Sequence, residues 1–220
     1  EDEPQIITRF LELAQSARQE HGPAPGIAPY KGLLFFEEWD AELFFGRETL
    51  TAHLADRVSD PTIGSSSRFL AIVGASGSGK SSLIRAGLAV RLRQAGWDVC
   101  IFTPGMVPSK ALEMQLELDQ DTAKSERLLI LVDQFEETFT LCRDESERVS
   151  FNDKLLRLAQ EPSGRITIVI ALRADFYSHC AQYPLLRQAV AAQQEYIGQM
   201  MAEELRRAIE KPARRGGWEF

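Results

Sequence analysis

The residue types with the clearest chemical meaning lie between positions 74 and 81. The sequence there is GASGSGKS, which matches the pattern G-x-x-x-x-G-K-[ST] in full. Glycines allow backbone N–H groups to approach a polyanion closely, because no Cβ stands in the way. Lys80 adds a positive charge for the β- and γ-phosphates, and the Ser81 hydroxyl is a ligand for Mg²⁺. The predicted nucleotide-binding residues are Gly74, Ala75, Ser76, Gly77, Ser78, Gly79, Lys80, Ser81 and Ser82.

A glycine-rich turn could match this pattern by accident, so the flanking elements matter. The apolar run 69–73 comes before the loop, and 82–93 follows it with Ile84, Leu88 and Leu92 at helical spacing. A helix that begins at the loop directs its positive dipole end at the bound anion. The order of strand, loop and helix therefore favours nucleotide binding over a chance match.

A second candidate site element is the carboxylate of Asp133, which directly follows the apolar run 128–132. By itself this pattern is weak, because many strands end in Asp at a turn. In combination with a phosphate-binding loop, an Asp at this place is the acid that holds the Mg²⁺ shell. The metal ligands predicted from the sequence are therefore Ser81 and Asp133.

Two further carboxylates follow, Glu136 and Glu137, while the residue next to Asp133 is the amide Gln134. Either carboxylate could orient a water that attacks the γ-phosphate. We take Glu136 as the first choice and expect one of the pair to be solvated.

Arg173 follows the apolar run 165–171 and could contact the γ-phosphate from the end of that strand. The alternative is an ordinary salt bridge to Asp175 or Glu136. The predicted catalytic residues are Lys80, Glu136, Glu137 and Arg173.

Composition excludes several function classes. The 220 residues carry a net charge of −7 with 44% hydrophobic residues, which suits a packed α/β domain and argues against nucleic-acid binding through bulk charge. Three isolated cysteines suggest neither a disulfide framework nor a zinc site, so we expect a reducing, cytoplasmic location. No apolar run is long enough for a membrane span.

The chain divides into three predicted regions. Residues 1–28 contain an amphipathic helix at 4–19 and a Pro/Gly-rich linker, 29–195 form the core, and 196–220 begin a helical lid. Because the chain starts without Met and stops just after a helical stretch, we expect it to be part of a longer protein.

Predicted strands are 69–73, 99–102, 128–132 and 165–171, and predicted helices include 82–93, 146–160 and 202–209. These strands are continuous apolar runs, which predicts a parallel sheet covered by helices on both faces, a three-layer αβα fold.

Several segments together resemble the novel STAND NTPases, which are P-loop signal-transduction ATPases of bacteria related to the AAA+ and NACHT groups. The resemblance covers roughly 29–220 and is carried by PYKGL at 29–33, DAELFFGRE at 40–48, the loop with SSLIRAGL, DQFEE at 133–137, LRADF at 172–176 and MAEELRRAIEKPARRGGW at 201–218. One departure is the stretch between 108 and 128, which is shorter than the family usually has.

The resemblance implies an ATP/ADP- and Mg²⁺-dependent switch with slow, regulated hydrolysis. It also implies sensor and effector modules in the same longer chain, and ATP-dependent homo-oligomers. By position, Phe45, Gly46 and Arg47 would contact the adenine or ribose, Arg173 would be the sensor arginine, and Pro212 would lie in the lid near the base. The residue types alone would instead make Phe45 a core residue and Arg47 a surface charge.

Three rival functions remain open on the sequence. A continuously cycling AAA+ type motor would need an arginine finger, for which Arg187 is a candidate, and fast turnover without a trigger. A small-molecule phosphoryl transferase would need an acceptor site, and a pure binding module would release no phosphate. The base preference between ATP and GTP stays open, because no base-reading motif is visible.

Overall fold

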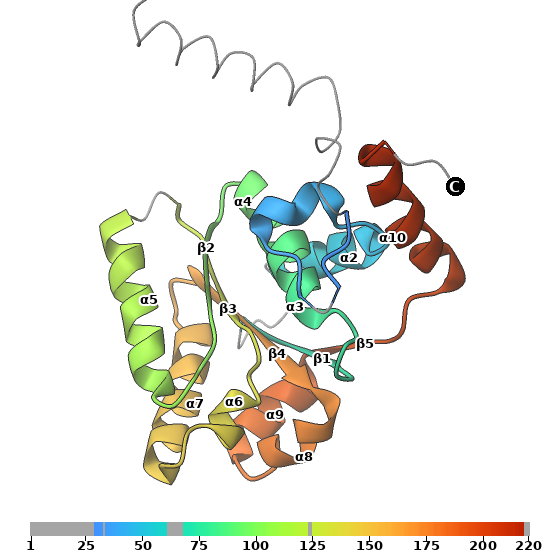
Figure 1. The fold of residues 1–220 in the computed structure, drawn as a ribbon. Helices are drawn as coiled ribbons and strands as arrows, with labels where there is room; N and C mark the ends of the chain where they lie inside the picture. Colours follow the sequence, from blue (N-terminus) through green and yellow to red (C-terminus); the bar gives the residue numbers. More distant parts are fainter. Residues whose placement is uncertain (1–28, 33, 61–67, 123–124, 218–220) are drawn as a thin grey trace, which may run out of the picture.

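The computed structural model describes residues 29–32, 34–60, 68–122 and 125–217 (Figure 1). The helix expected at 4–19, its linker to residue 28, and Trp218 lie outside the described residues. The other predictions for the core and for the beginning of the lid fall on described parts of the chain.

A five-stranded sheet forms the centre of the molecule, in the order β2-β3-β4-β1-β5 with all neighbouring strands parallel. The strands are β1 (Phe69–Gly74), β2 (Asp98–Phe102), β3 (Leu128–Val132), β4 (Ile166–Arg173) and β5 (Gln194–Ile197). Every residue of β1 and β3 is buried, which explains why their sequences are apolar throughout rather than alternating. The predicted α/β fold with a parallel sheet is confirmed.

Helical segments precede, connect and follow the strands. They are η1 (Glu38–Leu43), α2 (Glu48–Ser59), α3 (Lys80–Ser82), η2 (Leu83–Ala89), α4 (Val90–Gln94), α5 (Pro108–Thr122), α6 (Glu137–Thr140), α7 (Glu145–Ala159), η3 (Ala174–Phe176), α8 (Tyr177–Cys180), α9 (Pro184–Ala192) and α10 (Ala202–Arg215). The sequence patterns do not predict β5 or α9. Three of the four residues of β5 are polar or exposed, so this edge strand lacks the apolar run that marks the inner strands.

Helices cover both faces of the sheet (Figure 1). On one face, α5, α7 and α9 pack on alternate strand residues such as Ile130 and Ile168. On the other face, α2 and the helix after the phosphate-binding loop pack on the remaining positions, including Leu129 and Val169. Two hydrophobic clusters, one on each face, therefore hold the predicted three-layer sandwich together.

The helix after the loop is unusual, because its middle section η2 is a π-helix. A wider turn of this kind is rare and often occurs at functional sites. Gly87 lies in this section, and a Cβ there would be 2.8 Å from Thr51 Oγ1. The glycine thus allows α2 to pack closely against the helix that carries the loop.

The last helix, α10, lies beside η1 and α2 rather than on the sheet (Figure 1). It is longer than the predicted 202–209 and contains Pro212 in its interior. Within the described ranges, none of the helices has the length and apolar character needed to cross a membrane.

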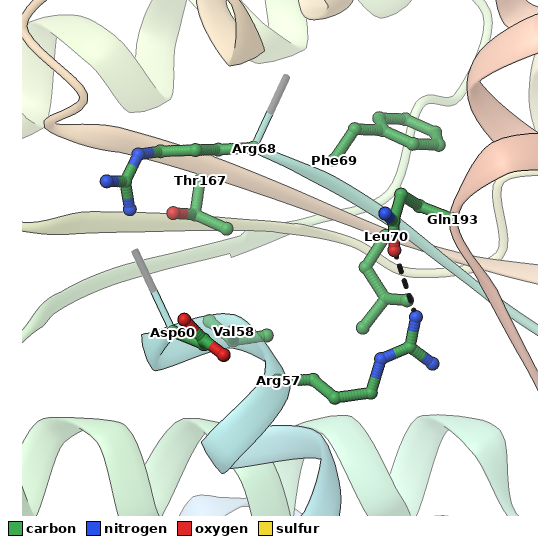
Figure 2. Close-up of a pocket in the computed structure, with 8 residues that line it drawn as sticks. All are labelled: Arg57, Val58, Asp60, Arg68, Phe69, Leu70, Thr167 and Gln193. Atoms are coloured by element: carbon green, nitrogen blue, oxygen red, sulfur yellow. Dashed lines mark hydrogen bonds between the residues drawn. The ribbon is translucent and has the colours of Figure 1, made fainter. Parts of the chain in front are cut away.

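A small cavity of about 20 Å³ lies at the edge of the sheet where β1 begins (Figure 2). Arg57 and Gln193 join across it through a hydrogen bond of 3.1 Å between Nη2 and Oε1. The phosphate-binding loop follows the other end of β1, so this cavity is remote from it and too small for a nucleotide.

Candidate nucleotide-binding site

The phosphate-binding loop connects β1 to α3 at the carboxyl edge of the sheet, where parallel α/β folds bind their ligands. Gly77 and Gly79 have φ angles of 73° and 87°, a left-handed conformation that only glycine adopts without strain. Lys80 is 8% exposed, and its Nζ donates to the carbonyl oxygens of Gly74 and Ala75 at 2.8 Å each. Burial lowers the pKa of Lys80, an effect that the nearby Glu136 partly opposes.

Ser81 and Asp133 meet in the structure as predicted for a metal site. The Ser81 hydroxyl donates to Asp133 Oδ1 at 2.9 Å, and the Asp133 side chain is 1% exposed. A hydroxyl, a carboxylate and the phosphates of the substrate are the ligand set that Mg²⁺ uses in such sites. The pair therefore fits Mg²⁺. The described residues contain no cluster of three or more His, Cys, Asp or Glu side chains suited to hold a metal without a substrate.

Ser82, the last residue of the predicted loop, has a contact of a different kind. Its hydroxyl accepts a hydrogen bond of 3.0 Å from the backbone N–H of Phe36. Ser82 thus joins the loop to the segment that precedes η1.

A tight turn after Asp133 determines the positions of the next two carboxylates, Glu136 and Glu137. Gln134 has a φ of 51°, and it is the single non-glycine residue with a positive φ among the described residues. Phe135 is fully buried, and its N–H donates to Ala171 O on β4 at 2.9 Å. Because Phe135 anchors the turn in the core, Glu136 is held at the carboxyl edge of the sheet.

Glu136 and Glu137 occupy different surroundings. Glu136 lines the same cleft as the loop, and Glu136 Oε2 accepts from the backbone N–H of Arg173 at 3.3 Å. Burial raises the pKa of Glu136, which makes it a better proton acceptor at neutral pH. Glu137 Oε2 instead accepts from the N–H of Gly105, in the turn after β2, at 3.1 Å. Glu137 is partly exposed and thus has a backbone partner outside the loop cleft.

Arg173 ends β4 directly opposite Gly74 in the strand register, so it lies beside the loop. Its guanidinium forms a bidentate pair with Asp175, with Nη2 and Oδ2 2.6 Å apart. The ordinary salt bridge considered above is therefore present. Arg173 nevertheless lines the cleft and lies close enough to Lys80 to influence its pKa.

These groups surround one cleft of about 550 Å³, which we call the loop cleft. Its polar wall contains loop residues, Asp133, Glu136 and Arg173. Its apolar wall comes from the end of η1, from the two segments that flank η1, and from the region of α10. The apolar residues are Leu34, Phe35, Phe36, Leu43, Phe44, Phe45, Met200 and Ala208. A cleft lined by charged groups and by aromatic rings suits a nucleotide, because the charged groups can bind phosphates and the rings can stack on a base.

The residues placed near the base by resemblance divide into two groups. Phe45 lines the loop cleft, whereas Gly46, Arg47 and Pro212 are not among its described lining residues. Arg47 is 6% exposed and donates to Gly198 O at 2.7 Å and to Glu204 Oε2 at 3.3 Å. The expectation from residue type that Arg47 is a surface charge is therefore wrong, since it is buried against the start of α10.

Pro212 is buried inside α10. Proline has no N–H, so it cannot bond to the carbonyl four residues earlier, which belongs to the cleft residue Ala208.

Arg85 belongs to the site as well, although it was not predicted from the sequence. Arg85 Nε donates to Asp133 Oδ2 at 2.9 Å, and its side chain is 16% exposed. The available signal was a single cation in the apolar stretch 83–90, one turn after the loop. Sequence spacing does not show which carboxylate pairs with such a cation.

Solved structures share this fold. The Aeropyrum pernix ORC2 protein in its ADPNP–ADP complexes has a TM-score of 0.55 at 16% identity, covering 77% of this chain and 52% of that one. The ADP form of the same protein gives a TM-score of 0.57 at 15% identity, with 78% and 53% covered. The chain thus spans about half the length of these proteins. Identities this low establish similarity of fold alone.

Sequence comparison is more specific. A search of curated proteins finds no significant match. The family model described as novel STAND NTPase 1 matches residues 29–220, which include the loop, Asp133, Glu136 and all of α10. The chain therefore belongs to the novel STAND NTPase 1 family and is a nucleotide-binding NTPase module.

Proposed function

We propose that this module binds ATP with Mg²⁺, hydrolyses it slowly, and acts as a nucleotide-controlled conformational switch in a multidomain signal-transduction protein. The observation that carries the proposal is the composition of the loop cleft. Core residues such as Lys80 and Glu136 share this cleft with Met200 and Ala208, from the region of the lid helix α10. A nucleotide in the cleft would contact both parts at once.

Contacts between α10 and the segment 42–48 give the switch a defined closed state. Arg47 pairs with Glu204, and the ring of Phe45 lies below Lys211 Nζ at 5.3 Å from the ring centre. The pairs that Glu48 forms with Arg207 and Lys211 are half-exposed and contribute little each, whereas the Arg47–Glu204 pair is largely buried. An interface of this type can open without a large loss of buried apolar surface.

A switch requires that the nucleotide states bind the two conformations with different affinity. The γ-phosphate would meet Lys80 and Arg173 at the polar end of the cleft, while the base end contacts the α10 region. We propose that ATP and ADP therefore favour different positions of α10. Sensor and effector modules elsewhere in the same protein, and ATP-dependent homo-oligomers, would respond to that movement.

Hydrolysis would use the chain's own groups in separate roles. Lys80 would bind the β- and γ-phosphates, Ser81 and Asp133 would hold the metal, and Glu136 would orient the attacking water and accept its proton. Arg173 would contact the γ-phosphate after leaving Asp175. Mg²⁺, when bound, supplies positive charge that stabilises the charge developing on the transferred phosphoryl group.

Hydrogen–deuterium exchange tests the switch directly. We expect backbone amides of α10 to exchange at different rates with Mg²⁺–ADPNP and with Mg²⁺–ADP, while amides of β1 and β3 exchange alike. Equal exchange of α10 in both states would exclude a switch through this helix. Many turnovers per second without any trigger would favour a cycling motor instead, and calorimetric titrations without heat for ATP or GTP would contradict nucleotide binding altogether.

A further inference from the structure

Arg85 lies between two carboxylates that belong to different parts of the chain. Its Nε donates to Asp133 Oδ2 at 2.9 Å, and its Nη1 donates to Glu37 Oε2 at 3.1 Å and Oε1 at 3.3 Å. Its guanidinium carbon also lies 4.8 Å from the centre of the Phe35 ring, which lines the loop cleft. Four contacts therefore define one orientation for this side chain.

The Asp133 carboxylate receives three hydrogen bonds. Ser81 Oγ and the N–H of Gln134 donate to Oδ1, both at 2.9 Å, and Arg85 donates to Oδ2. A carboxylate accepts hydrogen bonds and does not donate them, so the hydroxyl hydrogen of Ser81 is directed at Asp133. The lone pairs of Ser81 then remain available to a cation. Arg85 binds the other carboxylate oxygen, Oδ2, and so keeps the Asp133 carboxylate in the orientation in which Oδ1 accepts from Ser81.

The backbone around Arg85 supports a specific role. Arg85 lies in the π-helical section η2, where the wider turn changes the direction of side chains relative to a regular α-helix. The segment before η1 is attached to the same helix, because the Phe36 N–H donates to Ser82 Oγ at 3.0 Å. Glu37 is thus fixed next to Arg85 from the other side.

We propose that Arg85 is a positioning residue for the Mg²⁺–nucleotide site: it orients Asp133, and through Asp133 the Ser81 hydroxyl, and Glu37 holds Arg85 in place. The inference rests on the proposed function, since it requires Ser81 and Asp133 to hold Mg²⁺. Residues that orient metal ligands typically change metal affinity by about 10–100-fold when they are replaced.

The test measures how much Mg²⁺ strengthens nucleotide binding. Affinity for a fluorescent ATP analogue is determined in excess Mg²⁺ and in EDTA, and the ratio of the two affinities is compared between variants. We expect Arg85→Met to lower this ratio by about 10-fold or more, with the affinity in EDTA unchanged. Arg85→Lys keeps the charge but not the fork of donors, and Glu37→Gln loosens Arg85, so both are expected to give intermediate ratios.

Arg93→Met is the matched control. Arg93 lies on the same continuous helix and pairs with the neighbouring Glu38, with Nε and Oε2 2.8 Å apart. The structure gives it no contact with Asp133, so its ratio is expected to equal that of the wild type. A general loss of helix stability would affect both arginine variants, whereas a positioning role affects only Arg85.

Asp133→Asn distinguishes a failure of the proposed metal site from a failure of the proposed role of Arg85. If this variant keeps the wild-type ratio, the metal site of the proposed function is wrong. If Asp133→Asn lowers the ratio of the affinities in Mg²⁺ and in EDTA, while Arg85→Met leaves this ratio unchanged or raises it, only the role of Arg85 is overturned. Should Arg85→Met not fold, wild-type ratios for both Arg85→Lys and Glu37→Gln would overturn the role equally.

Discussion

The carboxylate of Glu136 accepts a hydrogen bond from the backbone N–H of Arg173, with 3.3 Å between oxygen and nitrogen. This contact joins the turn after β3 to the end of β4, next to the phosphate-binding loop. The adjacent Glu137 instead binds the N–H of Gly105. Two neighbouring carboxylates with the same chemistry therefore have different partners, and they should respond differently to substitution.

Glu136→Gln is expected to reduce ATP hydrolysis by about 100-fold or more, because it removes a proton acceptor from the loop cleft. Nucleotide affinity should change little, since the loop and Lys80 remain. Glu137→Gln is the matched control and should retain most of the activity, because an amide oxygen can still accept from Gly105. Phosphate release and equilibrium nucleotide binding measure both effects. Equal losses in the two variants would contradict the assignment of Glu136.

Lys80→Ala is expected to weaken ATP binding by at least about 10-fold, because a hydrogen bond to a charged group contributes about 1.5–3 kcal/mol. Titration calorimetry with Mg²⁺–ATP measures the loss. Lys154→Ala removes a lysine that pairs with Glu113 on the α5–α7 side of the sheet, and it should bind ATP like the wild type. Unchanged affinity of the Lys80 variant would contradict the predicted site.

Gly46→Ala should loosen α10. Gly46 has a φ of 91°, and a Cβ there would lie 2.4 Å from the carbonyl oxygen of Glu204. We expect destabilisation from the positive φ and a further cost of about 1–3 kcal/mol from the clash. Gly96→Ala is the control, because Gly96 has a φ of 84° but open space around its Cβ position. Thermal unfolding and hydrogen exchange of α10 measure the difference, and equal effects in both variants would argue against a tight contact at Gly46.

Cys180 gives a prediction for pH dependence. Burial raises the pKa of this thiol from 9.0 to about 12. The folded state therefore retains the proton that the unfolded state loses, so this contribution to stability is complete below pH 9 and declines as the pH rises toward 12. Between these limits, one thiol lowers the free energy of unfolding by about 1.4 kcal/mol per pH unit.

Denaturant unfolding at pH 7.5 and pH 10.5 measures this effect, with Cys180→Ala as the reference that lacks this thiol and keeps Cys100 and Cys142. The wild type should lose more stability than the variant over this interval. Thiol reagents at neutral pH should modify Cys180 only after unfolding. Rapid modification of the native protein would contradict the buried position.

Local sequence was sufficient to predict most of the elements of the core. The strands β1, β3 and β4 were predicted because both of their faces are buried, which requires an unbroken apolar run. The phosphate-binding loop was predicted because its glycines, Lys80 and Ser81 act within one short segment. In the same way, the apolar run that ends in Asp133 located the second carboxylate element.

Other features depend on contacts between distant segments, and only the tertiary structure decided them. The edge strand β5 needs no apolar run, so nothing in its sequence distinguishes it from a loop. Arg47 is buried because Glu204 and the Gly198 carbonyl come from the region of α10. Asp133 and Glu37 each lie 48 positions from Arg85, and folding alone brings all three together.

The physical reason is the range of the interactions. A few consecutive residues determine the backbone conformation and the burial pattern of a segment, whereas the partner of a charged side chain depends on which elements pack side by side. The sequence by itself determined that this chain binds a phosphate-bearing ligand at the end of a parallel sheet. The tertiary structure decided which carboxylate lines the loop cleft and which arginine pairs with Asp133.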